Sequence, residues 1–161
     1  MNLYLLRHGE AESNASTDAG RQLTEAGHQE AASVARQFAS MNYKLDACFV
    51  SPALRARQTA DTFLGHIFSS PEPVVIDELS ANQRAASIMK ILEKVDSENV
   101  LLVSHNPLLS ELLALLTEGS VDNLYILETG ELACIRLDII GLGMGSCSGI
   151  LQPDASQIPA S

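Results

Sequence analysis

Short apolar runs alternate along the chain with longer segments in which apolar residues recur at helical spacing. Four of the runs have the length of a buried strand: residues 3–6, 47–50, 74–76 and 100–103. A segment with helical spacing follows each run, over residues 24–41, 52–66, 88–95 and 107–116. This alternation predicts an α/β domain with three αβα layers and a mostly parallel central sheet.

The last third of the chain predicts edge elements and a tail. Apolar and polar residues alternate in part over residues 131–139, which predicts a late, antiparallel strand. A short edge strand is expected at residues 149–152. The G-x-G-x-G pattern at residues 141–145 is not followed by a helical segment, so it does not fit a nucleotide-binding loop. We therefore expect a single domain over residues 1–153 and a mobile tail over residues 154–161.

Composition and charge limit the partners of such a domain. A chain of 161 residues with 46% hydrophobic residues is long enough to bury one sizeable core. The net charge of −10 argues against general nucleic-acid binding, because proteins that bind phosphate backbones cluster Lys and Arg. No apolar run resembles a signal peptide or approaches the roughly 20 residues of a membrane helix. The three cysteines lack C-x-x-C spacing and predict buried, reduced thiols. We expect a cytoplasmic protein that binds neither nucleic acid nor membrane.

Candidate chemistry gathers directly after the predicted strands. Arg7, His8 and Gly9 follow the first strand, Ser51 follows the second, and His105 follows the fourth. The carboxyl ends of parallel strands lie at one edge of a sheet, which is where open α/β sheets bind ligands. We therefore expect these segments to form one site.

Two histidines and two arginines at that edge point to phosphoryl chemistry. Arg55 lies one turn after the start of the second helix, where backbone N–H groups and a guanidinium fork favour a phosphate. Alone, this arginine fits a solvated helix face better, and a lone histidine fits a structural role; together the four residues favour a phosphate site. We expect an unprotonated nitrogen of His8 to attack phosphorus, while Gly9 donates the hydrogen bond that fixes its ring. A cationic His105 would stabilise the phosphoryl oxygens. Positive neighbours and the lack of a Cys or carboxylate cluster argue against a metal ion.

Three motifs resemble, in order, those of the histidine phosphatase superfamily, which is also called phosphoglycerate-mutase-like. The R-H-G-x-x-x-x-N signature corresponds to residues 7–14, the second motif to residues 51–60 and the third to residues 104–106. The usual start of the family's first helix resembles Leu23-Thr24-x-x-Gly27. The motifs cover residues 2 to about 110, and the later strands fit the same fold.

The resemblance implies a phosphoglycerate-mutase-like fold and a reaction through a phosphorylated His8, with no cofactor. Arg7, Arg55 and His105 would hold the phosphoryl group. Further substrate contacts are expected from residues in or beside the motifs: Gly9, Asn14, Arg21 and Ser51.

The finer similarity is to the short bacterial branch of SixA-type protein-histidine phosphatases. The interval between the second and fourth strands is short here, whereas larger relatives insert helical lids in it. Asp18-x-x-Arg21-x-Leu23-Thr24 also resembles that branch. The resemblance implies as partner a protein that carries a phosphorylated histidine, namely a phosphotransfer domain or a phosphocarrier.

One departure from the family pattern concerns the general acid. The usual acid is a glutamate two residues after a leucine beyond the third strand, but here Leu79 leads to Ala81. Asp18, Glu78 and Asp77 are alternative acids at a different spacing. General acid catalysis contributes about 10²–10⁴-fold for a poor leaving group such as an alkoxide, whereas the imidazole of a phosphohistidine can depart neutral. The departure therefore favours phosphohistidine over a small phosphomonoester.

Three hypotheses follow from the sequence. The leading one is a monomeric, cofactor-independent protein-histidine phosphatase. The second is a phosphatase of small phosphomonoesters that uses one of the three carboxylates as its acid. The third, from another class, is an inactive module that binds phosphohistidine proteins, although such a module has no need of a nucleophile.

Overall fold

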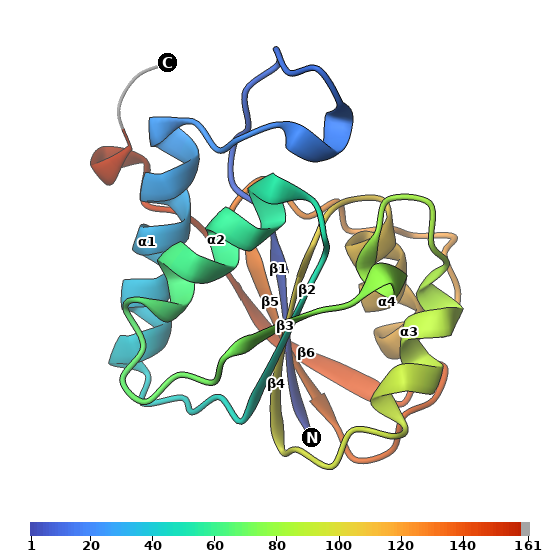
Figure 1. Ribbon diagram of the computed structural model, residues 1–161. Helices are drawn as coiled ribbons and strands as arrows, with labels where there is room; N and C mark the ends of the chain where they lie inside the picture. The colour runs from blue at the N-terminus through green and yellow to red at the C-terminus, as the bar shows by residue number, and fades with distance from the viewer. Residues whose placement is uncertain (159–161) are drawn as a thin grey trace.

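Six strands form one sheet in the computed structural model, which describes residues 1–158 (Figure 1). In the order β3-β2-β4-β1-β5-β6, the strands are β3 (Pro73–Val75), β2 (Ala47–Val50), β4 (Asn99–Ser104), β1 (Asn2–Arg7), β5 (Leu132–Leu137) and β6 (Gly145–Leu151). The first four of these pair in parallel, whereas β5 runs antiparallel to β1 and β6 antiparallel to β5. The predicted sheet, mostly parallel with an antiparallel edge, is confirmed.

Two helices cover each face of this sheet, which confirms the three-layer αβα arrangement (Figure 1). The helices are α1 (Glu25–Ser40) and α2 (Leu54–Leu64) on one face, and α3 (Ala85–Leu92) and α4 (Leu108–Thr117) on the other. Side chains of β1 alternate between the two cores, since Leu3 and Leu5 pack with α3 and α4 while Tyr4 and Leu6 pack with α1 and α2. A strand buried on both faces carries a continuous apolar run, which is why short runs predicted these strands.

Two elements differ from the sequence prediction. β6 begins at Gly145 rather than Gly149, because pairing with β5 outweighs the low strand propensity of glycine. At Gly145 a side chain would also be obstructed, since a Cβ would lie 2.8 Å from Leu137 Cδ2. α3 begins at Ala85 rather than Ile88, because the buried Ala85 extends its apolar face by one turn.

The segment predicted as a mobile tail lies against α1 as far as it is described. The Asp154 N–H donates to Ser33 Oγ over 2.9 Å, and the Arg36 guanidinium donates to Gln157 Oε1. Residues 159–161 of that tail lie outside the described residues. The predicted domain boundary at residue 153 stays a prediction.

Two other sequence predictions concern the cysteines and membranes. Cys48 and Cys134 are buried free thiols, as predicted, but the prediction for Cys147 was wrong because this residue lies exposed on the edge strand β6. Within residues 1–158, no helix is both long and apolar enough to cross a bilayer.

The strand order brings three loops together at the carboxyl edge of the sheet. β4 lies between β1 and β2, so the residues that follow these strands are neighbours. The His8 N–H donates to Ser104 O, and the Ser51 N–H donates to Val103 O, each over 2.9 Å. The backbone thus fixes the loops after β1 and β2 to the end of β4, directly before His105.

Candidate active site

His8 is buried just beyond β1, and its ring is held in one tautomer. Its Nδ1 lies 2.7 Å from the carbonyl oxygen of Gly9, which can only accept, so Nδ1 carries the proton. The Arg55 Nε–H donates to His8 Nε2 over 3.2 Å, which requires a lone pair on Nε2. The structure therefore presents Nε2 as an unprotonated nitrogen, which is the form that a nucleophile needs.

Gly9 serves this arrangement in a different way from the one expected. The prediction that Gly9 donates to the His8 ring was wrong, because its carbonyl accepts while its N–H donates to Thr59 Oγ1 over 3.1 Å. The absence of a side chain allows contact with α1 rather than with a ligand: a Cβ on Gly9 would lie 2.4 Å from the carbonyl oxygen of Gly27. Two glycines thus let the first turn of α1 pack directly on the loop that carries His8.

Arg55 lies in the first turn of α2 and is 5% exposed. Besides the bond from its Nε to His8, Arg55 makes two bonds to Asp18. Nη1 donates to the backbone oxygen of Asp18 (2.7 Å), and Nη2 donates to Asp18 Oδ2 (3.0 Å). The guanidinium fork therefore bridges His8 and the loop between β1 and α1. Its neighbour Arg57 is exposed, in agreement with a solvated helix face.

Arg7 and His105 place unpartnered buried nitrogens around His8. Arg7 Nη1 donates to the carbonyl oxygen of Leu127 over 2.6 Å, but its Nε has no hydrogen-bond partner within residues 1–158. Neither ring nitrogen of His105, which is 4% exposed, has one there either. The two imidazole centroids lie 6.4 Å apart. Because buried N–H groups are almost always paired, the Nε–H of Arg7 and one ring N–H of His105 fit a bound group rich in acceptor oxygens, such as a phosphoryl group.

Burial and neighbouring charges favour neutral imidazoles at this site. Burial lowers the pKa of His8 from 6.5 to about 4, and the guanidinium charges of Arg55 and Arg7 act in the same direction. Burial also lowers the pKa of His105, with the same two charges contributing and the nearby Ser80 carbonyl opposing. Burial costs a charged His105 ring its hydration, so the predicted cationic form, which concerns a ring beside a phosphate, stays a prediction.

The candidate acids differ in where they lie and in what they contact. The hydrogen bond from Arg55 holds the pKa of Asp18 below its usual range, and Arg21 adds to this effect. Asp18 is therefore at the site but ionised, a state in which it has no proton to donate. Glu78 lies exposed on the 3₁₀ turn Asp77–Leu79, and its carboxylate makes no hydrogen bond within the described part of the chain. Ala81, at the position of the family's usual glutamate, is exposed as well.

The other predicted contact residues shape the loops around His8. The Arg21 guanidinium donates to the carbonyl oxygens of Glu12 (2.6 Å) and Ala11 (3.4 Å) and to Asp18 Oδ1 (3.3 Å). Ser51 is buried, and its Oγ accepts from the Ala53 N–H at the start of α2 (3.3 Å). Asn14 is exposed in the loop.

Two contacts at the site were missed from the sequence. Thr59 accepts from Gly9 and donates to the Arg55 carbonyl oxygen over 2.7 Å. Its position four residues after Arg55 places both on one helix face, which is a signal that could have identified it. The Leu127 contact runs through a backbone carbonyl, so no side-chain pattern indicates it.

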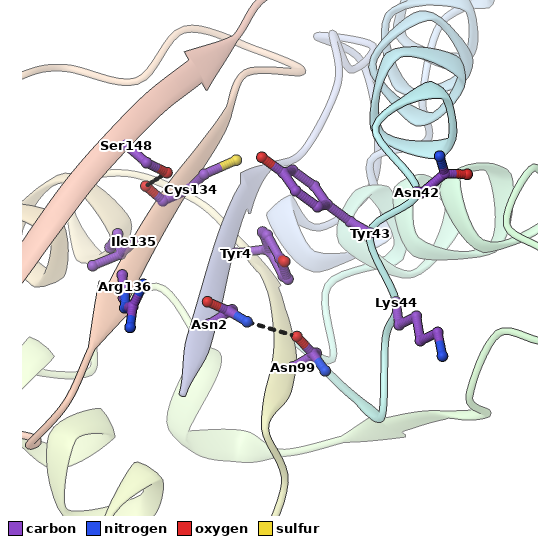
Figure 2. A pocket seen from close by; sticks show the side chains of 10 residues that line it. All are labelled: Asn2, Tyr4, Asn42, Tyr43, Lys44, Asn99, Cys134, Ile135, Arg136 and Ser148. Atoms are coloured by element: carbon purple, nitrogen blue, oxygen red, sulfur yellow. Dashed lines mark hydrogen bonds between the residues drawn. The ribbon is translucent and has the colours of Figure 1, made fainter.

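A separate cleft of about 280 Å³ opens at the amino-terminal edge of the sheet (Figure 2). Asn2 and Asn99 bond to each other across it over 2.8 Å. Burial raises the pKa of Tyr4 to about 12 and that of Cys134 to about 11, so both stay protonated near neutral pH. Neither Tyr4 nor Cys134 is therefore a ready nucleophile, and the candidate reactive groups remain those around His8.

Comparison with known proteins agrees with this geometry. A family model described as the histidine phosphatase superfamily (branch 1) matches residues 3–80. The chain is 30% identical over 147 residues to phosphohistidine phosphatase SixA of Escherichia coli K12, which covers 89% of each chain. It is 33% identical over 129 residues to the SixA homolog of Haemophilus influenzae, which covers 71% of this chain and 76% of that one. A solved structure of the protein histidine phosphatase SixA with tungstate superposes with a TM-score of 0.85 at 28% identity, over 95% of this chain and 97% of that one.

Proposed function

Because this chain belongs to the histidine phosphatase superfamily, in its short SixA-type branch, we propose that it removes the phosphoryl group from a protein histidine through a phosphorylated His8. The observation that carries the proposal is the state of the His8 ring. Nε2 is unprotonated and lies among unpartnered nitrogens of Arg7 and His105, while Nδ1 is held by the Gly9 carbonyl.

The first step is an in-line displacement at phosphorus. His8 Nε2 forms a bond to phosphorus as the P–N bond of the substrate phosphohistidine breaks. The substrate imidazole departs neutral when its other nitrogen already carries a proton. Arg55 Nε, which donates to Nε2 before the reaction, then becomes available to a phosphoryl oxygen, together with Arg7 and His105.

The second step transfers the phosphoryl group from His8 to water. The oxygen of water bonds to phosphorus, the P–Nε2 bond breaks, and the electron pair returns to Nε2. Since Nδ1 keeps its proton on the Gly9 carbonyl, His8 leaves as a neutral imidazole without a general acid. The proton of the attacking water passes to the phosphate product or to solvent, so the enzyme returns to its starting state.

The lack of a placed acid favours a phosphoramidate substrate over an alkyl phosphate. Ala81 has no proton to give, and Asp18 is held ionised by Arg55. An alkoxide leaving group needs a proton in the transition state, whereas a protonated phosphohistidine does not. A phosphotransfer domain or a histidine phosphocarrier in the cytoplasm is the partner that we propose.

We expect the protein to dephosphorylate a phosphorylated histidine phosphocarrier or phosphotransfer domain faster than 3-phosphoglycerate by at least about 10²-fold in kcat/KM. Release of phosphate from each substrate measures the ratio, with p-nitrophenyl phosphate as an ester that needs no acid. An Ala81→Glu variant is the matched control, because it should raise hydrolysis of the alkyl ester alone. Preference of the wild-type protein for 3-phosphoglycerate would indicate a small-molecule phosphatase, and binding without turnover would indicate an inactive module.

The depressed pKa of His8 predicts an unusual pH dependence. The ring should stay neutral from pH 7 down to about pH 5 and take up a proton with a midpoint near 4. In the unfolded chain the same ring titrates near pH 6.5, so the native state binds fewer protons between the two values, and stability falls as pH drops from about 6.5 toward 4. A nitrogen-detected NMR titration of the ring, assigned by its loss in His8→Ala, gives the midpoint. A midpoint near 6.5 would contradict the proposed resting state.

A further inference from the structure

The Arg7 guanidinium belongs to a set of hydrogen bonds that also includes Asn106, Ser110 and Leu127. The Leu127 carbonyl oxygen accepts from Arg7 Nη1 (2.6 Å) and from Asn106 Nδ2 (2.8 Å). Ser110 Oγ donates to Asn106 Oδ1 (2.8 Å) and accepts from the Leu127 N–H (3.1 Å). The side chains of Asn106 and Ser110 pair with each other and with the Leu127 backbone, which ties the Leu127 carbonyl to the start of α4.

Ser110 is the residue that ties this set to the scaffold. It is fully buried in the first turn of α4, and it contacts both the Asn106 side chain and the backbone of Leu127. Leu127 lies in the irregular segment between α4 and β5, whose preceding residues Tyr125 and Ile126 are 44% and 52% exposed. Its burial and the Ser110 bond therefore hold a segment that has no regular secondary structure.

This arrangement bears on the site because it uses one end of the Arg7 guanidinium and leaves the other free. Nη1 is directed to Leu127, whereas the buried Nε has no partner within residues 1–158. A guanidinium is planar, so the bond at Nη1 restricts the directions in which Nε–H can point. An acceptor that moved would let Arg7 rotate and lose the alignment that oxyanion stabilisation requires.

We propose that Ser110 is a positioning residue, which orients Arg7 toward the phosphoryl group through the Leu127 carbonyl and Asn106. The inference rests on the proposed function only in assigning the oxyanion that Arg7 binds. Ser110 itself reaches Arg7 through other groups and takes no part in the bond changes at phosphorus.

A double-mutant cycle with an oxyanion as ligand tests this role. Tungstate affinity is measured by calorimetry for the wild-type protein, Ser110→Ala, Arg7→Ala and the double variant. Ser110→Ala should weaken binding about tenfold in the wild-type background and by less than about twofold in the Arg7→Ala background, since residues in one network are not additive. In a His105→Ala background the tenfold effect should persist, because His105 has no bond to this set among the described residues.

Two further variants separate positioning from a general loss of structure. Thr117→Val removes a hydroxyl at the far end of α4, which among the described residues donates only to the Leu113 carbonyl (2.9 Å), and should leave tungstate affinity unchanged. Where Ser110→Ala does not fold, as judged by circular dichroism, Asn106→Ala takes its place, with the same dependence on Arg7 expected.

An equal loss of tungstate affinity with and without Arg7, or no loss in a folded Ser110→Ala, would overturn the proposal, as would a wild-type protein that binds no tungstate. The ligand also separates this inference from the proposed function. A protein that binds tungstate with the expected coupling but hydrolyses no phosphohistidine substrate would refute the function and leave the role of Ser110 standing.

Discussion

Replacing His8 with alanine is expected to lower kcat by about 10⁴-fold or more, because the substitution removes the atom that bonds to phosphorus. The fold should survive. Within residues 1–158, the His8 side chain forms hydrogen bonds with only the Gly9 carbonyl and Arg55, and Arg55 keeps its two bonds to Asp18. Circular dichroism and a thermal unfolding curve would check that the variant is native.

Phosphate release from a phosphorylated histidine protein gives the loss of turnover, and trapping of the intermediate gives its cause. With a ³²P-labelled substrate, acid-labile label should appear on the wild-type protein and not on His8→Ala. The matched control is His66→Ala, because His66 is exposed on the turn after α2, away from the site. Turnover within about tenfold of wild type, or label that persists in the variant, would show that another residue is the nucleophile.

The sequence predicted where the candidate side chains gather because strand ends in a parallel sheet converge by topology. A buried strand needs a continuous apolar run, and the first polar residue after such a run marks its end, which placed His8, Ser51 and His105 correctly at one edge. The predicted helix start then added Arg55, which lies one turn after it, and the motif positions agreed. Side-chain periodicity carries enough information for this level of description.

Contacts made by backbone atoms could not be predicted, because side-chain patterns do not indicate them. The packing of Gly9 on Gly27, the Leu127 carbonyl and the direction of the His8–Gly9 bond depend on backbone atoms, which every residue has. The lowered pKa of His105 could not be predicted from the sequence either, because burial and not sequence spacing causes it. β6 was predicted too short because its glycines adopt a strand only through pairing with β5.

Asp18 binds the same Arg55 guanidinium that contacts His8, which the motifs do not show. In the resting site its carboxylate and its backbone oxygen occupy both Nη groups of Arg55, whose Nε donates to His8. In the proposed intermediate, a phosphoryl group on Nε2 takes the position to which Nε points, while the Nη groups keep their bonds to the loop between β1 and α1. Under the proposed function, Arg55 therefore has two roles: it stabilises the transferred group and anchors that loop.

That double use predicts a large effect for a change that keeps the charge. Arg55→Lys should lower kcat/KM by about 10²–10³-fold, because an ammonium cannot donate to His8 and to two oxygens of Asp18 in the geometry of a planar fork. Steady-state kinetics with the phosphoprotein measures the loss. Arg57→Lys is the control on the same helix, where an exposed side chain should tolerate the change within about twofold. Activity of Arg55→Lys within tenfold of wild type would mean that positive charge alone suffices at this position, and that the fork contributes to loop anchoring rather than to phosphoryl transfer.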